Sequence, residues 1–155
     1  DLVKIDLGCH IDGYITVAAH TVQVGGGDIT GPRADVVLAT HQAAEVAAKM
    51  IKAGNTNAQV TAAIKKVAEA YGVNLVAGTL MHQMRRHIID APKVIILREE
   101  LEQKVEECTF EDFEVYAVDV AMSSGEGKPR ETDSRTTVFK RQADKSYRLK
   151  IKASR

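Results

Sequence analysis

The sequence predicts one α+β domain, with paired strands first, two helices next and further strands after them. Three patterns support this fold class: alternation of apolar and polar residues near the start, helical periodicity in the middle, and β-branched runs in the second half. A chain of 155 residues with 45% hydrophobic content can bury a core, which excludes a disordered protein.

A β-hairpin is predicted at the start of the chain, between a strand over residues 3–7 and a strand over residues 14–24. Apolar and polar residues alternate in the first strand, so one of its faces is expected to be buried. The apolar members of this face are Val3, Ile5 and Leu7. Gly8, Asp12 and Gly13 supply turn chemistry, because glycine adopts positive φ without steric cost.

Two antiparallel helices are predicted after the hairpin. Apolar residues recur at helical spacing from Asp35, which is expected to cap the first helix, to about residue 53. Thr56 or Asn57 can cap the second helix, and Gly72 ends it. The connection between the helices is short, so they are expected to be antiparallel neighbours.

The second half of the chain contains three predicted strands. Residues 94–97 are apolar and predict a buried strand, while the acidic segment 99–107 predicts a turn or a short helix. Residues 113–122 predict a long strand, with Val115, Ala117, Asp119 and Ala121 on one of its faces, and residues 136–140 predict a shorter strand.

The net charge of zero conceals an uneven distribution of charge along the chain. Residues 99–119 are strongly acidic, whereas residues 128–155 contain ten basic and three acidic side chains. A basic stretch of this density attracts phosphate groups, although a solvated basic tail is the simpler interpretation.

The chain begins at Asp1 without a methionine, so we expect a single partial domain over residues 1–155 whose basic stretch continues into a segment beyond Arg155.

Membrane insertion, secretion and disulfide stabilisation are not expected. No apolar run approaches the roughly 18–20 residues of a membrane-spanning helix, and no basic and apolar leader is present. These features are typical of an intracellular protein. Cys9 and Cys108 are far apart in sequence, which argues against a disulfide framework or a zinc knuckle, and both are expected to be buried or unreactive thiols.

Three residues are candidates for a metal centre. Asp6 points away from its apolar strand neighbours, and Asp119 lies in so apolar a segment that it must be paired, hydrogen-bonded or metal-bound. His82 is expected in an irregular segment. Two strand carboxylates and a histidine are typical metal ligands of a metallohydrolase centre. The simpler alternatives are surface acids and a structural histidine.

Three sequence words resemble those of the type 2 methionine aminopeptidases. These are KIDLG at residues 4–8, HIDGYI at residues 10–15 and EVYAVD at residues 114–119. The resemblance covers essentially the whole chain and implies the central part of a pita-bread fold, with antiparallel strands and a helix pair. In that family, five side chains hold two metal ions.

The metal ligands of that family are only partly present. The first carboxylate falls on Asp6, the histidine on His82, and a glutamate is replaced by Asp119, while the fifth ligand would lie beyond the end of the chain. The second bridging carboxylate falls on Val17, which has no lone pair to offer a metal ion. The family's catalytic histidine falls on Asp90. The resemblance therefore implies a degenerate site without metal or other cofactor, although a single ion on the three remaining ligands is an alternative.

With these departures from the aminopeptidases, the chain resembles the proliferation-associated, ErbB-receptor-binding proteins. This group includes the fission-yeast curved-DNA-binding protein. The matching words lie at residues 6–8, 10–13, 18–21, 82–84, 87–90, 123–128 and 135–141. The resemblance implies an inactive aminopeptidase scaffold that associates with RNA and ribosomes and moves between nucleolus and cytoplasm. It also implies protein partners related to transcription and receptors, and leaves DNA binding open.

The first hypothesis is a non-enzymatic, RNA- and ribosome-associated regulator of growth. Its candidate nucleic-acid contacts are Arg85, Arg86, Lys128, Arg130, Arg135, Lys140, Arg141, Lys150 and Lys152. Few aromatic residues accompany the late basic ones, so recognition of shape and charge is favoured over base stacking. Pairing of the two neighbouring arginines with the acidic segment 99–114 is the competing interpretation.

Two other functions stay open on the sequence. One is a metal-dependent methionine aminopeptidase with an altered ligand set, in which another residue replaces the missing carboxylate at Val17. The other is a protein-binding scaffold, whose cleft lined by Asp6, His82 and Asp119 accepts a peptide terminus.

Overall fold

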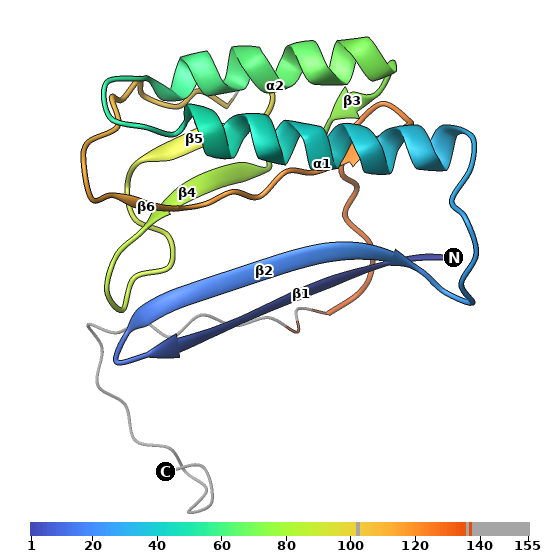
Figure 1. The fold of residues 1–155 in the computed structure, drawn as a ribbon, viewed down its shortest axis with the longest axis horizontal. Helices are drawn as coiled ribbons and strands as arrows, with labels where there is room; N and C mark the ends of the chain where they lie inside the picture. The colour runs from blue at the N-terminus through green and yellow to red at the C-terminus, as the bar shows by residue number, and fades with distance from the viewer. Residues whose placement is uncertain (102, 136, 138–155) are drawn as a thin grey trace, which may run out of the picture.

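The computed structural model describes residues 1–101, 103–135 and 137. Within them, two long strands form a hairpin, two helices follow, and five short strands complete the fold. Figure 1 shows the two helices on one side of the domain, the hairpin on the opposite side and the short strands between them. The predicted α+β class is therefore confirmed.

The hairpin consists of β1 (Leu2–Ile11) and β2 (Tyr14–Gln23), which pair antiparallel along their whole length. Asp12 and Gly13 both have positive φ, 51° and 85°, as a two-residue turn between right-twisted strands requires. The predicted hairpin is confirmed. Gly8, however, is not part of the turn, because it lies within β1 opposite Val17.

The exposed face of the hairpin is the apolar one. Val3, Ile5 and Leu7 were expected to be buried, but all three are exposed, and Leu7 is 62% exposed. The half-buried hairpin residues, such as Val17 and Thr21, lie on the other face together with Asp6. The prediction was wrong because alternation shows which residues share a face, whereas the position of the rest of the domain decides which face is covered.

The first helix, α1 (Pro32–Met50), begins and ends earlier than predicted. Gly31 is its N-cap residue, with φ 62°, and proline stands at the start of the helix, where its missing N–H is not needed. Asp35 does not cap the helix. It lies in the first turn, where a carboxylate interacts favourably with the helix dipole.

The second helix, α2 (Asn57–Tyr71), has the predicted boundaries. Thr56 and Gln59 form a capping box, in which each side chain accepts a hydrogen bond from the other residue's backbone N–H. Gly72 closes the helix in the left-handed conformation, with φ 63°. The two helices lie side by side and antiparallel (Figure 1), as predicted.

The core lies between the helix pair and the short strands. Small side chains on α1 allow α2 to approach closely, and larger apolar residues of α2 and the strands fill the space beneath. The fully buried members of this core are Ala39, Ala43, Ala47, Val60, Ile64, Met81, Ile95 and Leu97. This packing fixes the central strands that hold the candidate site.

The short strands form two small antiparallel sheets. One has the order β5 (Val94–Ile96), β4 (Leu80–Met84) and β6 (Val115–Ala117), and the other pairs β3 (Asn74–Leu75) with β7 (Met122–Ser123). The strand predicted at 94–97 is thus confirmed.

The long strand predicted over residues 113–122 is wrong, because the chain leaves one small sheet after Ala117 and joins the other at Met122. Between them, the backbone N–H of Val76 donates to the carbonyl of Ala121. The described residues of the segment 99–107 contain a turn and no helix. The strand predicted at 136–140 lies outside the described residues, apart from residue 137.

Two other sequence expectations can be compared with the described residues. Cys9 and Cys108 are both free thiols, and Cys9 is exposed, so of the two expected alternatives only an unreactive thiol is left for Cys9. It lies on the exposed face of the hairpin. No helix within the described residues is both long enough and apolar enough to cross a membrane.

Candidate functional site

Asp119 lies within electrostatic range of both Asp6 and His82, although the three residues come from distant segments of the chain. Asp6 lies in β1, His82 lies in the middle of β4, and Asp119 follows the end of β6. The pKa of Asp119 is raised, mainly because the surrounding protein desolvates its carboxylate and further because Asp6 is negative, while His82 acts in the opposite direction. Asp119 and Asp6 are nevertheless both exposed.

His82 is held by strand pairing on both sides, opposite Val94 of β5 and Ala117 of β6. The expected irregular segment is therefore a central strand. Its sequence, LMHQM, has little β propensity, so the two partner strands impose the conformation. The Nδ1 atom of His82 is buried and has no hydrogen-bond partner among the described residues. His82 thus carries one buried polar atom whose hydrogen-bonding capacity is unused among the described residues.

Val17 stands on the same hairpin face as Asp6, because Val17 pairs with Gly8 and Asp6 pairs with Ala19. The Cγ1 atom of Val17 would lie 3.1 Å from a Cβ atom at Gly8, so the valine side chain covers the glycine. The side chain at this position, onto which the resemblance places the second bridging carboxylate, is thus a hydrocarbon group.

The remaining donors do not fit a two-metal centre. Within the described ranges, no group of three or more His, Cys, Asp or Glu side chains is placed to hold a metal ion. A two-metal centre needs bridging oxygen ligands, and Val17 supplies none. The carboxylates of Asp6 and Asp119 can still accept hydrogen bonds from a cationic or protonated group.

The tip of the hairpin is attached to the loop between β4 and β5. The backbone N–H of His87 donates to the carbonyl of Gly13 at 2.9 Å, and Nε of Arg86 donates to the carbonyl of Asp12 at 2.8 Å. A Cβ atom at Gly13 would lie 2.4 Å from the His87 ring, so only glycine fits there. Sequence reasoning missed this contact, because Asp12 and Arg86 are 74 positions apart and no periodic pattern relates them.

Arg85 and Arg86 are exposed and do not pair with the described residues of the acidic segment. Nε of Arg85 donates to Oε1 of Gln83, and neither arginine belongs to the ion pairs found in the described part of the chain. The acidic segment instead pairs with Lys93, which contacts Glu111 at 2.9 Å and Glu114 at 2.7 Å. The competing interpretation of the two arginines is therefore wrong.

A polar network around Glu114 supports β4 and β6. Glu114 accepts hydrogen bonds from the side chains of Gln83, Lys93 and Tyr116. Burial alone would raise the pKa of Glu114, but these bonds and one from the Glu111 backbone lower it. The pKa of Lys93 is raised, chiefly by its bond to Glu114, and burial together with Glu114 raises that of Tyr116. Sequence reasoning also missed this network.

The basic stretch is only partly described. Lys128, Arg130 and Arg135 are exposed and follow β7. The other predicted nucleic-acid contacts, Lys140, Arg141, Lys150 and Lys152, lie outside the described residues.

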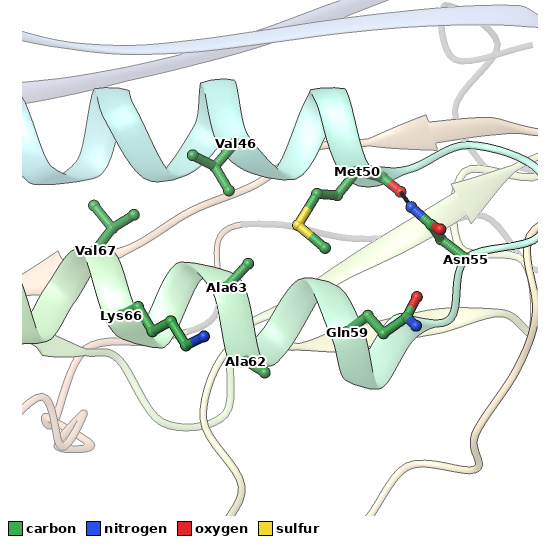
Figure 2. Close-up of a pocket in the computed structure, with 8 residues that line it drawn as sticks. All are labelled: Val46, Met50, Asn55, Gln59, Ala62, Ala63, Lys66 and Val67. Atoms are coloured by element: carbon green, nitrogen blue, oxygen red, sulfur yellow. Dashed lines mark hydrogen bonds between the residues drawn. The ribbon is translucent and has the colours of Figure 1, made fainter.

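A shallow groove of about 500 Å³ runs between the two helices. Figure 2 shows Val46 and Met50 of α1 facing Ala63 and Val67 of α2 across it. Asp6, His82 and Asp119 do not line this groove, so it is separate from the candidate site.

The comparisons with known proteins place the chain in a family. Residues 1–128 match the model described as metallopeptidase family M24. The chain is 49% identical to "Proliferation-associated protein A" of Dictyostelium discoideum over 158 residues, which is 100% of this chain and 41% of that protein. It is 49% identical to "ERBB-3 BINDING PROTEIN 1" of Solanum tuberosum over 156 residues, again 100% of this chain and 40% of that protein.

Two further similarities agree with this placement. The "Curved DNA-binding protein" of Schizosaccharomyces pombe is 45% identical over 158 residues, covering 100% of this chain and 41% of that protein. The solved "Structure of a thermophilic Arx1" superposes with a TM-score of 0.81 at 29% identity, covering 99% of this chain and 47% of that chain. The chain thus spans about two fifths of the length of the curated relatives it matches.

The resemblance to the proliferation-associated and ErbB-receptor-binding proteins is confirmed, and so is the pita-bread fold that it implies. The chain belongs to metallopeptidase family M24.

Proposed function

We propose that this chain is part of a non-enzymatic, RNA- and ribosome-associated regulator of growth, built on an inactive aminopeptidase scaffold. One observation carries the proposal: the predicted RNA-contacting residues in the described part of the chain are exposed and take no part in its ion pairs. Exposed arginines and lysines neutralise backbone phosphates without reading sequence.

The names of the similar proteins support nucleic-acid and protein partners. The fission-yeast relative is named for binding curved DNA, and the potato relative for binding ErbB-3. The Dictyostelium relative is named for its association with proliferation. On these names we propose protein partners and DNA as a second ligand. RNA binding and a location in cytoplasm and nucleolus are proposed from the resemblance alone.

RNA titration tests the proposal directly. The full chain and a chain ending at Gly127 are each titrated with a fluorescent, structured ribosomal RNA fragment at low salt. We expect the full chain to bind and the truncated chain to bind at least about tenfold more weakly, because ten basic residues are removed. Failure of the full chain to bind at low salt would overturn the proposal.

A pair of charge variants provides the matched control for that titration. Arg130→Gln with Arg135→Gln removes two charges from the basic stretch, whereas Lys49→Gln with Lys65→Gln removes two exposed charges from the helices. The first variant is expected to weaken RNA binding and the second to leave it unchanged. Equal losses in both would show that net charge alone determines binding.

The absence of peptidase activity is the second part of the proposal, and Val17 is its basis. Under this proposal the chain does not hydrolyse a methionine-initiated peptide in the presence of Co²⁺. Val17→Asp is expected to increase Co²⁺ binding in a calorimetric titration, because it adds an oxygen ligand on the face of Asp6.

Ala18→Asp is the matched control, because it adds a carboxylate on the opposite face of the same strand. Hydrolysis by the unmodified chain would contradict the proposal and favour an aminopeptidase with an altered ligand set. If Val17→Asp binds Co²⁺ no more tightly than the unmodified chain, the metal site has lost more than one ligand.

A further inference from the structure

We propose that the tip of the β1–β2 hairpin and the adjoining β4–β5 loop bind one unpaired nucleotide of RNA. The ring of Tyr14 stacks on the base, and the guanidinium groups of Arg85 and Arg86 contact the flanking phosphates. This inference rests on the proposed function, since it locates a base-stacking contact within the RNA-binding surface.

Tyr14 presents an exposed aromatic ring at the end of the hairpin. It is 68% exposed, although it is the first residue of β2 and next to the buried Gly13. The Cζ atom of Arg86 lies 5.2 Å from the centre of the Tyr14 ring. An exposed aromatic ring with a guanidinium over it combines the two groups on which unpaired bases and their phosphates are held.

Both arginines are fixed in place by bonds that use Nε. Arg86 donates from Nε to the carbonyl of Asp12, and Arg85 donates from Nε to Oε1 of Gln83. Gln83 is buried and donates in turn to Glu114. These bonds involve neither of the two terminal nitrogens of each guanidinium, which are the groups that bind a phosphate in a bidentate manner.

The backbone beneath these side chains is rigidly connected. Asp12 and His87 both adopt positive φ, 51° and 62°, which non-glycine residues rarely do. The Gly13 N–H donates to Nδ1 of His10 at 3.3 Å, and the rings of His10 and His87 meet edge to face at 6.4 Å. A site that is ordered before binding loses less conformational entropy when the ligand arrives.

The geometry favours an unpaired nucleotide over a duplex. The Tyr14 ring can stack only on a base whose face is not already covered by neighbouring bases. Asp12 places one carboxylate among the basic groups at the tip, so charge alone gives weak attraction there and stacking contributes the preference.

The test compares single-stranded and duplex RNA. The full chain, Tyr14→Ala and Tyr14→Phe are titrated with a fluorescein-labelled oligouridine and with an RNA duplex of equal length. Tyr14→Ala is expected to weaken oligouridine binding by about tenfold, the loss typical of one stacked base, and to change duplex binding by less than about twofold. Tyr14→Phe keeps the ring and is expected to bind oligouridine like the unmodified chain.

Phe113→Ala is the matched control, because Phe113 is a fully exposed aromatic residue just before β6. It is expected to leave oligouridine binding unchanged. Tyr14→Leu, which keeps an apolar side chain without a ring, repeats the test if Tyr14→Ala unfolds. Thermal melting shows which variant is folded.

The outcomes separate this inference from the proposed function. If the unmodified chain binds oligouridine and both ring-less variants bind equally well, the stacking site is wrong while the proposed function stands. An equal loss in Phe113→Ala would also overturn the site. If the unmodified chain binds neither RNA, the proposed function and the site both fail.

Discussion

Gly13 determines how the hairpin is attached to the rest of the domain. It has φ 85°, and its missing side chain leaves room for the His87 ring. We predict that Gly13→Ala lowers the free energy of unfolding by about 3 kcal/mol, through positive-φ strain and overpacking together. Gly26→Ala is the control: it has φ 72° but open space around it, so about 1 kcal/mol is expected. Urea unfolding measures both, and equal losses would refute a tight contact.

The ionisation of Glu114 makes the free energy of unfolding depend on pH. Its pKa is lowered in the folded chain, so its stabilising contribution is present above its ordinary value of 4.5 and is lost as the pH falls through the folded value. We predict that Glu114→Gln lowers the free energy of unfolding by about 2 kcal/mol at pH 7. The same variant should lose less stability than the unmodified chain between pH 5 and pH 3.

Glu99→Gln is the control for this prediction, because Glu99 is exposed and lies outside the Glu114 network. The free energy of unfolding of Glu99→Gln should equal that of the unmodified chain at every pH. An identical acid profile for Glu114→Gln would show that the network contributes nothing to the acid dependence.

Among the elements, α2 was predictable from its ends, because a capping box and a terminal glycine are local signals. We predict that Thr56→Ala lowers the free energy of unfolding by about 1 kcal/mol, since it leaves the N–H of Gln59 without its partner. Thr30→Ala, in the exposed loop before α1, should have no measurable effect in the same thermal melts. Equal effects would remove the capping explanation.

The strands were less predictable than the helices, because their partners are distant. Residues 113–122 are rich in apolar and β-branched residues, yet β4 pairs with this segment only through His82, Gln83 and Met84. His82 itself lies in a strand that its neighbours impose. The start of α1 was also misplaced, since Gly31 caps it without a side-chain hydrogen bond that a sequence pattern could show.

In the whole molecule, family resemblance identified residues that periodicity could not relate. Asp119, a residue matched through the aminopeptidase words, lies within electrostatic range of the two other matched residues, Asp6 and His82. Contacts between residues that neither periodicity nor the resemblance relates to each other, such as Tyr14 with Arg86, emerged only from the folded chain. The apolar outer face of the hairpin is exposed in this chain, which spans about two fifths of its curated relatives.

The salt dependence of RNA binding tests the central claim most directly. The binding constant for the ribosomal RNA fragment is measured from about 50 to 200 mM salt for the full chain and for the chain ending at Gly127, because each phosphate contact releases counterions. If the chain is an RNA-binding scaffold, the binding constant of the full chain decreases steeply with salt. The truncated chain shows a shallower slope, because it makes several fewer phosphate contacts. Binding that is independent of salt, or absent at the lowest salt, would contradict it.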